Sequence, residues 1–288
     1  MANINWYPGH MAKTRRQMSE YMKLVDIVYE VIDARMPYSS RIKDINSIIG
    51  SKPRIIIMTK MDLCDVKETH KWINYYEKMG HKVIGLDLEK TTNLNSLISL
   101  TNEVVKPLNE KRERLGLNAR KIRVMIIGIP NVGKSTLINR LVGRKATKIG
   151  NKPGVTKSLD WIRINNDLEL LDTPGILWPK LDDKKVAFNL ASLTAIKEEI
   201  LPLDEVAIYI LKVLSKHYKN ILEERYGVSD IDFEDIIPTL DFIGKKRGCL
   251  IKGGEIDYDK VINIIINDLK NGIIKNVTFD RYEEPNAN

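Results

Sequence analysis

Short apolar runs alternate with longer amphipathic stretches along the chain up to about residue 172. Runs rich in Ile and Val that are bounded by polar turns are typical of strands buried in a parallel sheet. We predict such strands at residues 27–33, 54–58, 82–86 and 122–127, and a strand pair at 158–164 and 168–171. Helical periodicity lies between them at 41–49, 65–79, 94–106 and 134–141, and a further helix is expected at 11–24. This alternation predicts an α/β fold with a doubly wound, mostly parallel sheet.

The pattern changes to helical periodicity alone after Trp178-Pro179. Apolar residues recur at helical spacing over 186–198, 203–218, 233–244 and 258–271, which predicts amphipathic or buried helices. We therefore expect two domains: an α/β domain over residues 1–178 and a small all-α domain over residues 179–288.

A phosphate-binding loop follows the strand predicted at 122–127. Its sequence is Gly128-Ile129-Pro130-Asn131-Val132-Gly133-Lys134-Ser135, followed by Thr136 at the start of a helix. Glycines let backbone N–H groups surround an anion, and the helix N-terminus adds its positive dipole. In this pattern the Lys134 ammonium reaches the outer phosphates, and the Ser135 hydroxyl binds Mg²⁺. A nucleoside triphosphate site is therefore expected here.

Two further motifs complete a magnesium-dependent nucleotide site. Asp172-Thr173-Pro174-Gly175 follows a predicted strand, so Asp172 is expected to hold the magnesium ion through water and the Gly175 amide to contact the γ-phosphate. Thr156 is the candidate that completes the metal shell, although a threonine on a surface turn would give the same pattern.

Thr59-Lys60-Met61-Asp62 has the form of a guanine-reading motif. The Asp62 carboxylate can accept hydrogen bonds from N1–H and the exocyclic amine of guanine, and adenine lacks that donor pair. The Lys60 stem can cover the base. Thr59 stands where Asn is commoner, and its hydroxyl can make only some of the asparagine's bonds. Asp87 and Leu88 are the candidates for a second base-contacting loop.

The order of these motifs is unusual, because the base-reading motif precedes the phosphate loop instead of following the switch motif. The order predicts a P-loop GTPase domain whose two halves are exchanged along the chain, which is a circular permutation. The switch region then leads directly into the predicted helical domain, so nucleotide state can act on that domain.

Composition adds few constraints. A net charge of +8 and a pI near 9.2 favour a polyanionic partner, but many basic proteins bind none. No apolar run of 18 residues predicts a membrane span, and the first residues do not form a secretory signal. Cys64 and Cys249 have no metal-binding spacing and are typical of free thiols in a reducing cytosol. We expect a cytoplasmic protein that is a monomer.

Several long strings of the chain resemble the circularly permuted GTPases of the YlqF/YawG type. They are Trp6-Tyr7-Pro8-Gly9-His10-Met11, Asp33-Ala34-Arg35-Met36-Pro37, the phosphate loop, Pro153-Gly154-Val155-Thr156, the segment from Asp172 to Pro179, and Lys246-Arg247-Gly248-Cys249-Leu250. The resemblance implies a GTPase that acts late in assembly of the large ribosomal subunit, is stimulated by that particle, and contacts ribosomal RNA through its helical domain.

The resemblance also implies two roles in hydrolysis. Ile176 occupies the position where Ras-like GTPases carry a water-orienting glutamine, and the family instead uses a histidine that matches His10. A surface histidine is the alternative for His10. Related GTPases with Asn at the position of Asn131 hold a potassium ion there, although Asn also stabilises loops by itself.

Basic residues in the first 22 positions, at 110–114 and at 245–247 can bind phosphate backbones or can form solvated surface. Two other functions remain open from the sequence. One is an RNA-binding assembly scaffold in which GTP is mainly a stabilising ligand. The other is a GTPase tied to RNA modification, although no further cofactor motif is present.

Overall fold

The computed structural model describes residues 21–43, 45–90, 94–117, 120–143, 160–164, 168–172, 183–193 and 202–282. The helix expected at 11–24 lies mostly outside this part, and its end forms a short 3₁₀ turn, η1, at Met22–Leu24. The boundary expected between residues 178 and 179 also lies outside the described residues.

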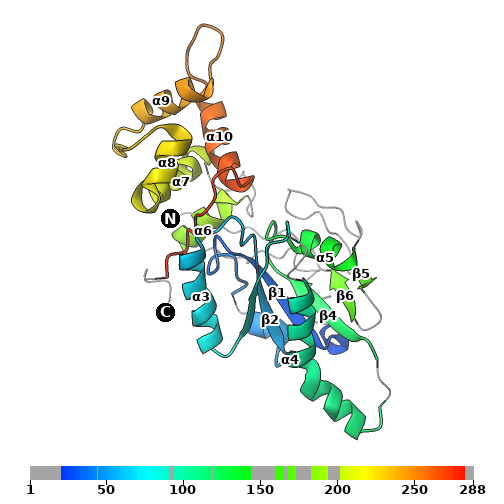
Figure 1. The fold of residues 1–288 in the computed structure, drawn as a ribbon. Coiled ribbons are helices and arrows are strands. Elements are labelled where there is room, and N and C mark those ends of the chain that lie inside the picture. Colours follow the sequence, from blue (N-terminus) through cyan, green and yellow to red (C-terminus); the bar gives the residue numbers. More distant parts are fainter. Residues whose placement is uncertain are drawn as a thin grey trace.

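The described strands form one six-stranded sheet in the order β3-β2-β1-β4-β6-β5 (Figure 1). Only β5 runs antiparallel, against β6, so the predicted mostly parallel sheet is confirmed. The strands are β1 Ile27–Asp33, β2 Arg54–Thr59, β3 Lys82–Gly85, β4 Ile122–Ile127, β5 Asp160–Arg163 and β6 Leu168–Asp172.

Alternate residues of the central strands face different layers of helices. Ile55 and Ile57 of β2 join a core that includes Leu97 of α4 (Leu94–Arg114) and Leu137 of α5 (Lys134–Val142). Ile56 and Met58 instead join the core of Trp72 in α3 (Val66–Lys78). Because strand side chains alternate between faces, these two cores lie on opposite sides of the sheet. The sheet is doubly wound, as predicted.

The helix predicted at 41–49 is wrong in its first half. In the structure α2 spans only Ile45–Ile49. Arg41 to Lys43 do not form a helix. Just before them, the Ser40 hydroxyl donates to the Met36 carbonyl at 2.5 Å and accepts from the Asp33 amide at 3.0 Å. These local bonds compete with helical ones.

Five helices follow the sheet in the described chain: α6 Lys184–Ser192, α7 Leu203–His217, α8 Lys219–Tyr226, α9 Ile237–Arg247 and α10 Tyr258–Lys270. They share a core that contains Ile210, Leu214, Ile243 and Ile265. α8 was not predicted, and the helix predicted at 233–244 begins only at Ile237. Asp232 accepts hydrogen bonds from the amides of residues 234 and 235, which holds that segment in a turn.

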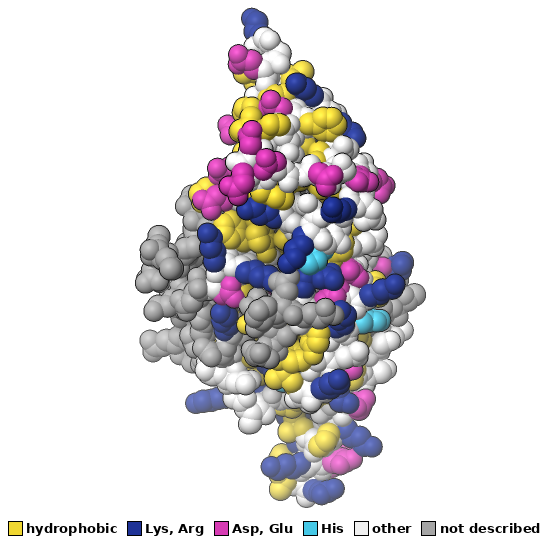
Figure 2. Space-filling model, turned by 90° about the vertical axis from the view of Figure 1, so that its left-hand side faces the viewer, with side chains coloured by type: hydrophobic (Ala, Val, Ile, Leu, Met, Phe, Trp, Pro, Cys, Tyr) yellow, Lys and Arg dark blue, Asp and Glu magenta, His cyan; other side chains and the backbone are white. Residues whose placement is uncertain are grey.

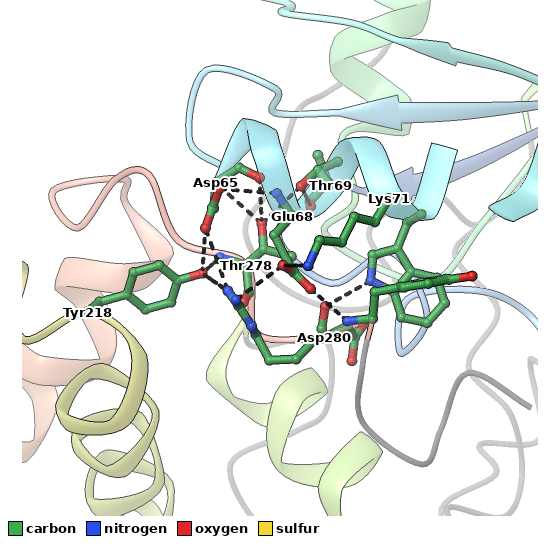
Figure 3. Close-up of polar contacts among 11 residues, drawn as sticks. Asp65, Glu68, Thr69, Lys71, Tyr218, Thr278 and Asp280 are labelled. Carbon is green, nitrogen blue, oxygen red and sulfur yellow. Dashed lines mark hydrogen bonds and ion pairs between the residues drawn. The ribbon is translucent and has the colours of Figure 1, made fainter. Parts of the chain in front are cut away.

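Residues 277–282, which we call the strap, run from the helical region back to the sheet region. Phe279 donates its amide to the Arg35 carbonyl at 2.8 Å, and the Trp72 indole donates to the Asp280 carbonyl at 2.8 Å. Figure 3 shows Thr278 of the strap lying between Tyr218 of the helical region and Thr69 of α3, with Asp280 further along the strap. The strap therefore joins the two regions with buried polar contacts.

The Asp280 carboxylate anchors the strap at its centre. It accepts from the amides of Tyr38 and Ser39, from the Ser39 hydroxyl and from the Asn189 side chain on α6, at 2.6 to 2.8 Å. The side chains of Asp280, Ser39 and Asn189 are all buried. Because a buried carboxylate requires hydrogen-bond donors, this cluster fixes α6, the strap and the loop after β1 relative to one another.

Candidate nucleotide site

The predicted motifs meet at the carboxyl ends of the parallel strands. From β1 the chain winds outward through β2 to β3, whereas from β4 it winds to the opposite edge, so the strand order reverses between β1 and β4. Crevices at such a reversal are the usual ligand sites of doubly wound sheets. The phosphate loop follows β4 and Asp33 ends β1, so both lie at this reversal of the strand order.

The backbone of the phosphate loop requires its two glycines. A Cβ on Gly128 would lie 2.4 Å from the Val31 carbonyl oxygen, and Gly133 has a φ of +92° and faces Thr59. Asn131 also adopts a left-handed φ of 64°, a conformation that Asn tolerates better than most residues. The loop is therefore pressed tightly against β1 and the end of β2.

α5 begins directly after this loop, at Lys134. Its first turn contains Ser135 and Thr136, so their amides belong to the group of N–H donors that a helix N-terminus offers to an anion. The Lys134 ammonium is buried and donates to the Ile129 carbonyl at 2.9 Å, which bends the side chain back over the loop. This geometry suits phosphate binding.

Thr59 connects the base-reading motif to the phosphate loop. Its hydroxyl lies 2.6 Å from the Val132 carbonyl and 3.1 Å from the Ile32 carbonyl, and its single proton serves one of them at a time. The side chain is fully buried. Thr59 thus brings together two halves of the site that are 73 residues apart in the chain.

Lys60 has a left-handed backbone, with a φ of 58°, which is strained for a long side chain. Its ammonium donates to the Asn131 carbonyl at 2.9 Å and pairs with the Asp33 carboxylate at 2.9 Å. The Lys60 ammonium therefore lies between the phosphate loop and the end of β1.

Asp33 and Arg35 extend this contact to the helical region. The Arg35 guanidinium binds both Asp33 oxygens at 2.9 to 3.1 Å and donates to the Leu269 carbonyl, at the end of α10, at 2.6 Å. Both side chains are fully buried. Burial by itself would raise the pKa of Asp33, but the charges of Arg35 and Lys60 hold that pKa well below its usual range. Asp33 is thus a buried carboxylate held between two cations.

Asp62 lies beside the loop that follows β3. Leu86 donates its amide to the Met58 carbonyl at 2.7 Å, and Met61 donates to the Leu86 carbonyl at 3.4 Å, so this loop runs next to the base-reading motif. Partial burial and the charges of Asp87 and Glu89 raise the pKa of Asp62. Asp87 also accepts from the Glu89 amide, and Leu88 is buried. The loop that carries Asp87 and Leu88 therefore runs beside the base-reading motif, and its contact with a base stays a prediction.

The candidate metal ligands are only partly described. Asp172 ends β6, and its backbone is in register with Ile126 of β4, so it lies beside the strand that leads to the phosphate loop. Ser135 opens α5 from the same loop. These positions fit a magnesium site formed by a hydroxyl, a carboxylate and phosphates. His10, Thr156 and Gly175 lie outside the described residues.

Comparisons with known proteins show the family to which the chain belongs. The family model described as 50S ribosome-binding GTPase matches residues 123–237, from β4 onward. Ribosome biogenesis GTPase A of Priestia megaterium is 46% identical over 278 residues, which are 96% of each chain. The protein of that name from Bacillus cereus is 45% identical over 281 residues, covering 98% of this chain and 95% of the relative. The chain belongs to the ribosome biogenesis GTPase A family.

A solved structure shares the architecture. GNP-bound YlqF from T. maritima matches 94% of this chain and 99% of its own chain, with a TM-score of 0.65 and 26% identity. The family and the fold together make this chain a circularly permuted P-loop GTPase, an enzyme class that hydrolyses GTP and ordinarily uses magnesium. In the described part of the chain, no helix is long and apolar enough to cross a bilayer.

The sequence did not reveal the Asp33–Arg35–Leu269 connection. The local sign of this connection was an acidic residue at the end of a buried strand with a basic residue two positions later, but the carbonyl partner is 234 residues away from Arg35. Two arginines, one in the charged segment at 110–114 and one just after it, also have internal contacts that the sequence did not show. Arg112 and Arg120 both pair with Asp26, at 2.5 and 2.9 Å.

Proposed function

We propose that the protein is a GTP-hydrolysing switch that binds the precursor of the large ribosomal subunit during its late assembly. One observation chiefly supports the proposal: the Thr59 hydroxyl joins the base-reading motif to the phosphate loop at the carboxyl ends of the strands. The relatives are named for ribosome biogenesis, and the matching family model is described as ribosome-binding.

In this proposal the phosphates lie on Asn131, Val132, Gly133, Lys134, Ser135 and Thr136. Ser135, Thr156 and Asp172 hold magnesium, and the Gly175 amide contacts the γ-phosphate. The base lies against Thr59, Lys60, Met61 and Asp62, with Asp87 and Leu88 alongside. Asn131 holds a potassium ion near the bridging oxygen, where it offsets developing negative charge.

The guanine-reading role of Asp62 is tested by Asp62→Asn. An amide can donate a hydrogen bond to the C2 carbonyl of xanthine but loses one acceptor for guanine. We expect affinity for GTP to fall by about 100-fold or more and preference to move to XTP. Titration with GTP, XTP and ATP measures this. Unchanged preference for GTP would show that another group reads the base.

The proposed role of His10 is to orient or polarise the attacking water. We expect His10→Ala to bind GTP like the wild type and to lose most of the turnover that purified large subunits stimulate. His70→Ala, on the exposed face of α3, is the control. Full stimulation in His10→Ala would refute the role.

The partner is tested by nucleotide-dependent co-sedimentation with immature and mature large subunits, combined with GTP turnover. The proposal requires tighter binding to immature particles with a GTP analogue than with GDP, and faster turnover when particles are present. Binding without stimulated turnover would favour the scaffold function instead.

A further inference from the structure

A cavity of about 410 Å³ lies on the α3 side of the sheet. Its lining comes from the loop after β1, from α2, from the end of α3, from the first residue of β2 and from α6. We call it the arginine cavity, because Arg41 and Arg54 both line it. A cavity of this size is within the range that holds a small molecule.

Two guanidinium groups of the arginine cavity share one carboxylate. Arg41 binds Glu30 through Nε and Nη2 at 3.1 and 3.0 Å, and Arg54 lies 3.3 Å from the same carboxylate. The Glu30 side chain is fully buried, and those of Arg54 and Arg41 are only 7% and 19% exposed. None of the described residues that line the cavity is an aspartate or a glutamate. The cluster therefore carries an excess of one positive charge.

Arg54 is also short of hydrogen-bond acceptors. Its Nη1 is buried and makes no hydrogen bond, and its Nη2 lies 3.1 Å from Nε2 of His81. Burial lowers the pKa of Arg54 and the charge of Arg41 acts in the same direction, although Glu30 opposes them. Because buried donors and charges without partners cost free energy, an oxyanion that joins this cluster is stabilised by it.

Much of the remaining wall is aromatic and aliphatic. Tyr75 and Tyr76 of α3 line it together with Ile42 and Leu190. The Arg41 guanidinium stacks over the Tyr76 ring, with its central carbon 4.6 Å from the ring centre. Small-molecule sites usually combine apolar walls of this kind with a few polar groups that fix orientation. An occupant therefore needs an apolar body as well as a negative charge.

The arginine cavity opens to solvent beside α2. Lys43, Asn46 and Ser47 line it and are exposed. Figure 2 shows lysine and arginine side chains across the middle of the molecule, where the two regions meet, and acidic side chains on the helical region above. α6 and the loop after β1 both line the cavity and are bonded to each other at this junction. The surface charge there attracts a small anion.

The inner end of the cavity adjoins the nucleotide site without being part of it. The cavity reaches Ile129 of the phosphate loop, whose carbonyl accepts from the Lys134 ammonium at 2.9 Å. Ser39, which also lines the cavity, donates to Asp280 of the strap at 2.6 Å. None of the described residues assigned to the nucleotide site lines the cavity. An occupant therefore lies beside the phosphate loop but does not take the place of GTP.

We propose that the arginine cavity is a second ligand site, which binds a small organic anion with one carboxylate or sulfonate group on a flat apolar body. The single negative charge balances the excess charge of the two arginines, and the apolar body packs against the tyrosines and aliphatic side chains. Hydrogen bonds between a guanidinium and an oxyanion are among the stronger ones in proteins. The assignment does not depend on the ribosomal partner.

Two dyes with the same body test the charge. Anilinonaphthalene sulfonate carries one sulfonate group, and phenylnaphthylamine lacks it. Each is titrated into the full-length protein by fluorescence, with GDP and magnesium in excess so that the nucleotide site is filled, and calorimetry gives the stoichiometry. We expect one sulfonate dye to bind per chain, about tenfold more tightly than the neutral dye.

Asn46→Trp tests the place, because it puts a large side chain at the mouth of the cavity without changing its charge. The matched control is Asn95→Trp, on the exposed surface of α4 across the sheet. We expect Asn46→Trp to weaken binding of the sulfonate dye about tenfold or more and Asn95→Trp to leave it unchanged.

Arg41→Gln tests the cation, since the amide can still donate to Glu30. It should weaken binding of the sulfonate dye about tenfold and leave binding of the neutral dye unchanged. Urea unfolding checks that each variant is folded. If Arg41→Gln does not fold, the tryptophan variants and the two dyes still decide the question.

Equal binding of the sulfonate dye to the two tryptophan variants would overturn the proposal, because the dye would then bind elsewhere. Equal affinity for the two dyes would also overturn it, because the arginines would then contribute nothing. A fall in dye affinity with increasing GDP concentration would place the dye in the nucleotide site and would overturn the proposal as well. Each of these outcomes leaves the proposed GTPase function intact.

Discussion

Glu30, in the middle of β1, is a fully buried carboxylate in the centre of the sheet. Arg41 binds it with two bonds at 3.0 and 3.1 Å, and Arg54 lies 3.3 Å away. Arg54 in turn contacts the His81 ring, at 3.1 Å from Nε2. Arg41, Arg54 and His81 also line the arginine cavity of about 410 Å³ that reaches Ile129 of the phosphate loop. An imidazole beside a guanidinium is held in its neutral form.

The neutral state of His81 makes stability depend on pH. Burial and then the charges of Arg54 and Arg41 lower its folded-state pKa, so the unfolded chain, with a pKa near 6.5, takes up the proton first. The free energy of unfolding should therefore fall as pH drops from 7.5 to 5.5. In His81→Gln this fall should be shallower, as urea unfolding at both values measures.

His217, whose pKa is lowered as well, contributes in the same direction, so the double variant with His217→Gln should flatten the dependence further. His70→Gln is the control. If His81→Gln lost as much stability on acidification as the wild type, the cluster around Glu30 would not be the source.

At the scale of elements, strands were predicted more accurately than helix ends. Strands buried on both faces are continuous apolar runs, and each of the six was predicted within about two residues. α8 was missed because only Leu222 and Tyr226 are buried in its eight residues, which is too few positions to reveal a period. α4 continues through Pro107 to Arg114, where the sequence is rich in charge and the apolar pattern at 94–106 has ended.

In the nucleotide site, too, features within one segment could be predicted from the sequence, whereas contacts between distant segments could not. The phosphate loop could be predicted because its glycines, lysine and serine are required at fixed spacing in one segment. The sequence showed that Thr59 stands where Asn is commoner. Its hydrogen bond to Val132 could not be predicted, because a contact across 73 residues leaves no periodic pattern. The same holds for the strap and for Arg35. Long-range polar contacts depend on the completed fold.

At the scale of the whole molecule, Arg35 joins the nucleotide site to α10. We expect Arg35→Met to reduce the free energy of unfolding by about 3 kcal/mol, the lower end for a broken buried pair, because Lys60 still faces Asp33. The Lys60 ammonium contacts both Asp33 and the Asn131 carbonyl of the phosphate loop, so a change around Asp33 reaches that loop. Affinity for GTP should therefore fall several-fold. Urea unfolding and nucleotide titration measure the two effects.

Arg225→Met is the matched control, since it breaks an arginine–aspartate pair within the helical region. It should reduce stability without changing GTP affinity. If both variants weakened GTP binding equally, the effect would be a general loss of stability and not a specific connection through Asp33.

The strap has a consequence for how the chain is made. Trp72, whose indole donates to the Asp280 carbonyl, is synthesised 208 residues before Asp280. Ser39, whose hydroxyl donates to the Asp280 carboxylate, is synthesised earlier still. Domains begin to fold while translation continues. The early half of this protein therefore leaves the ribosome before the acceptors of these two donors have been synthesised, and the bonds of the strap can form only after residue 280 has emerged.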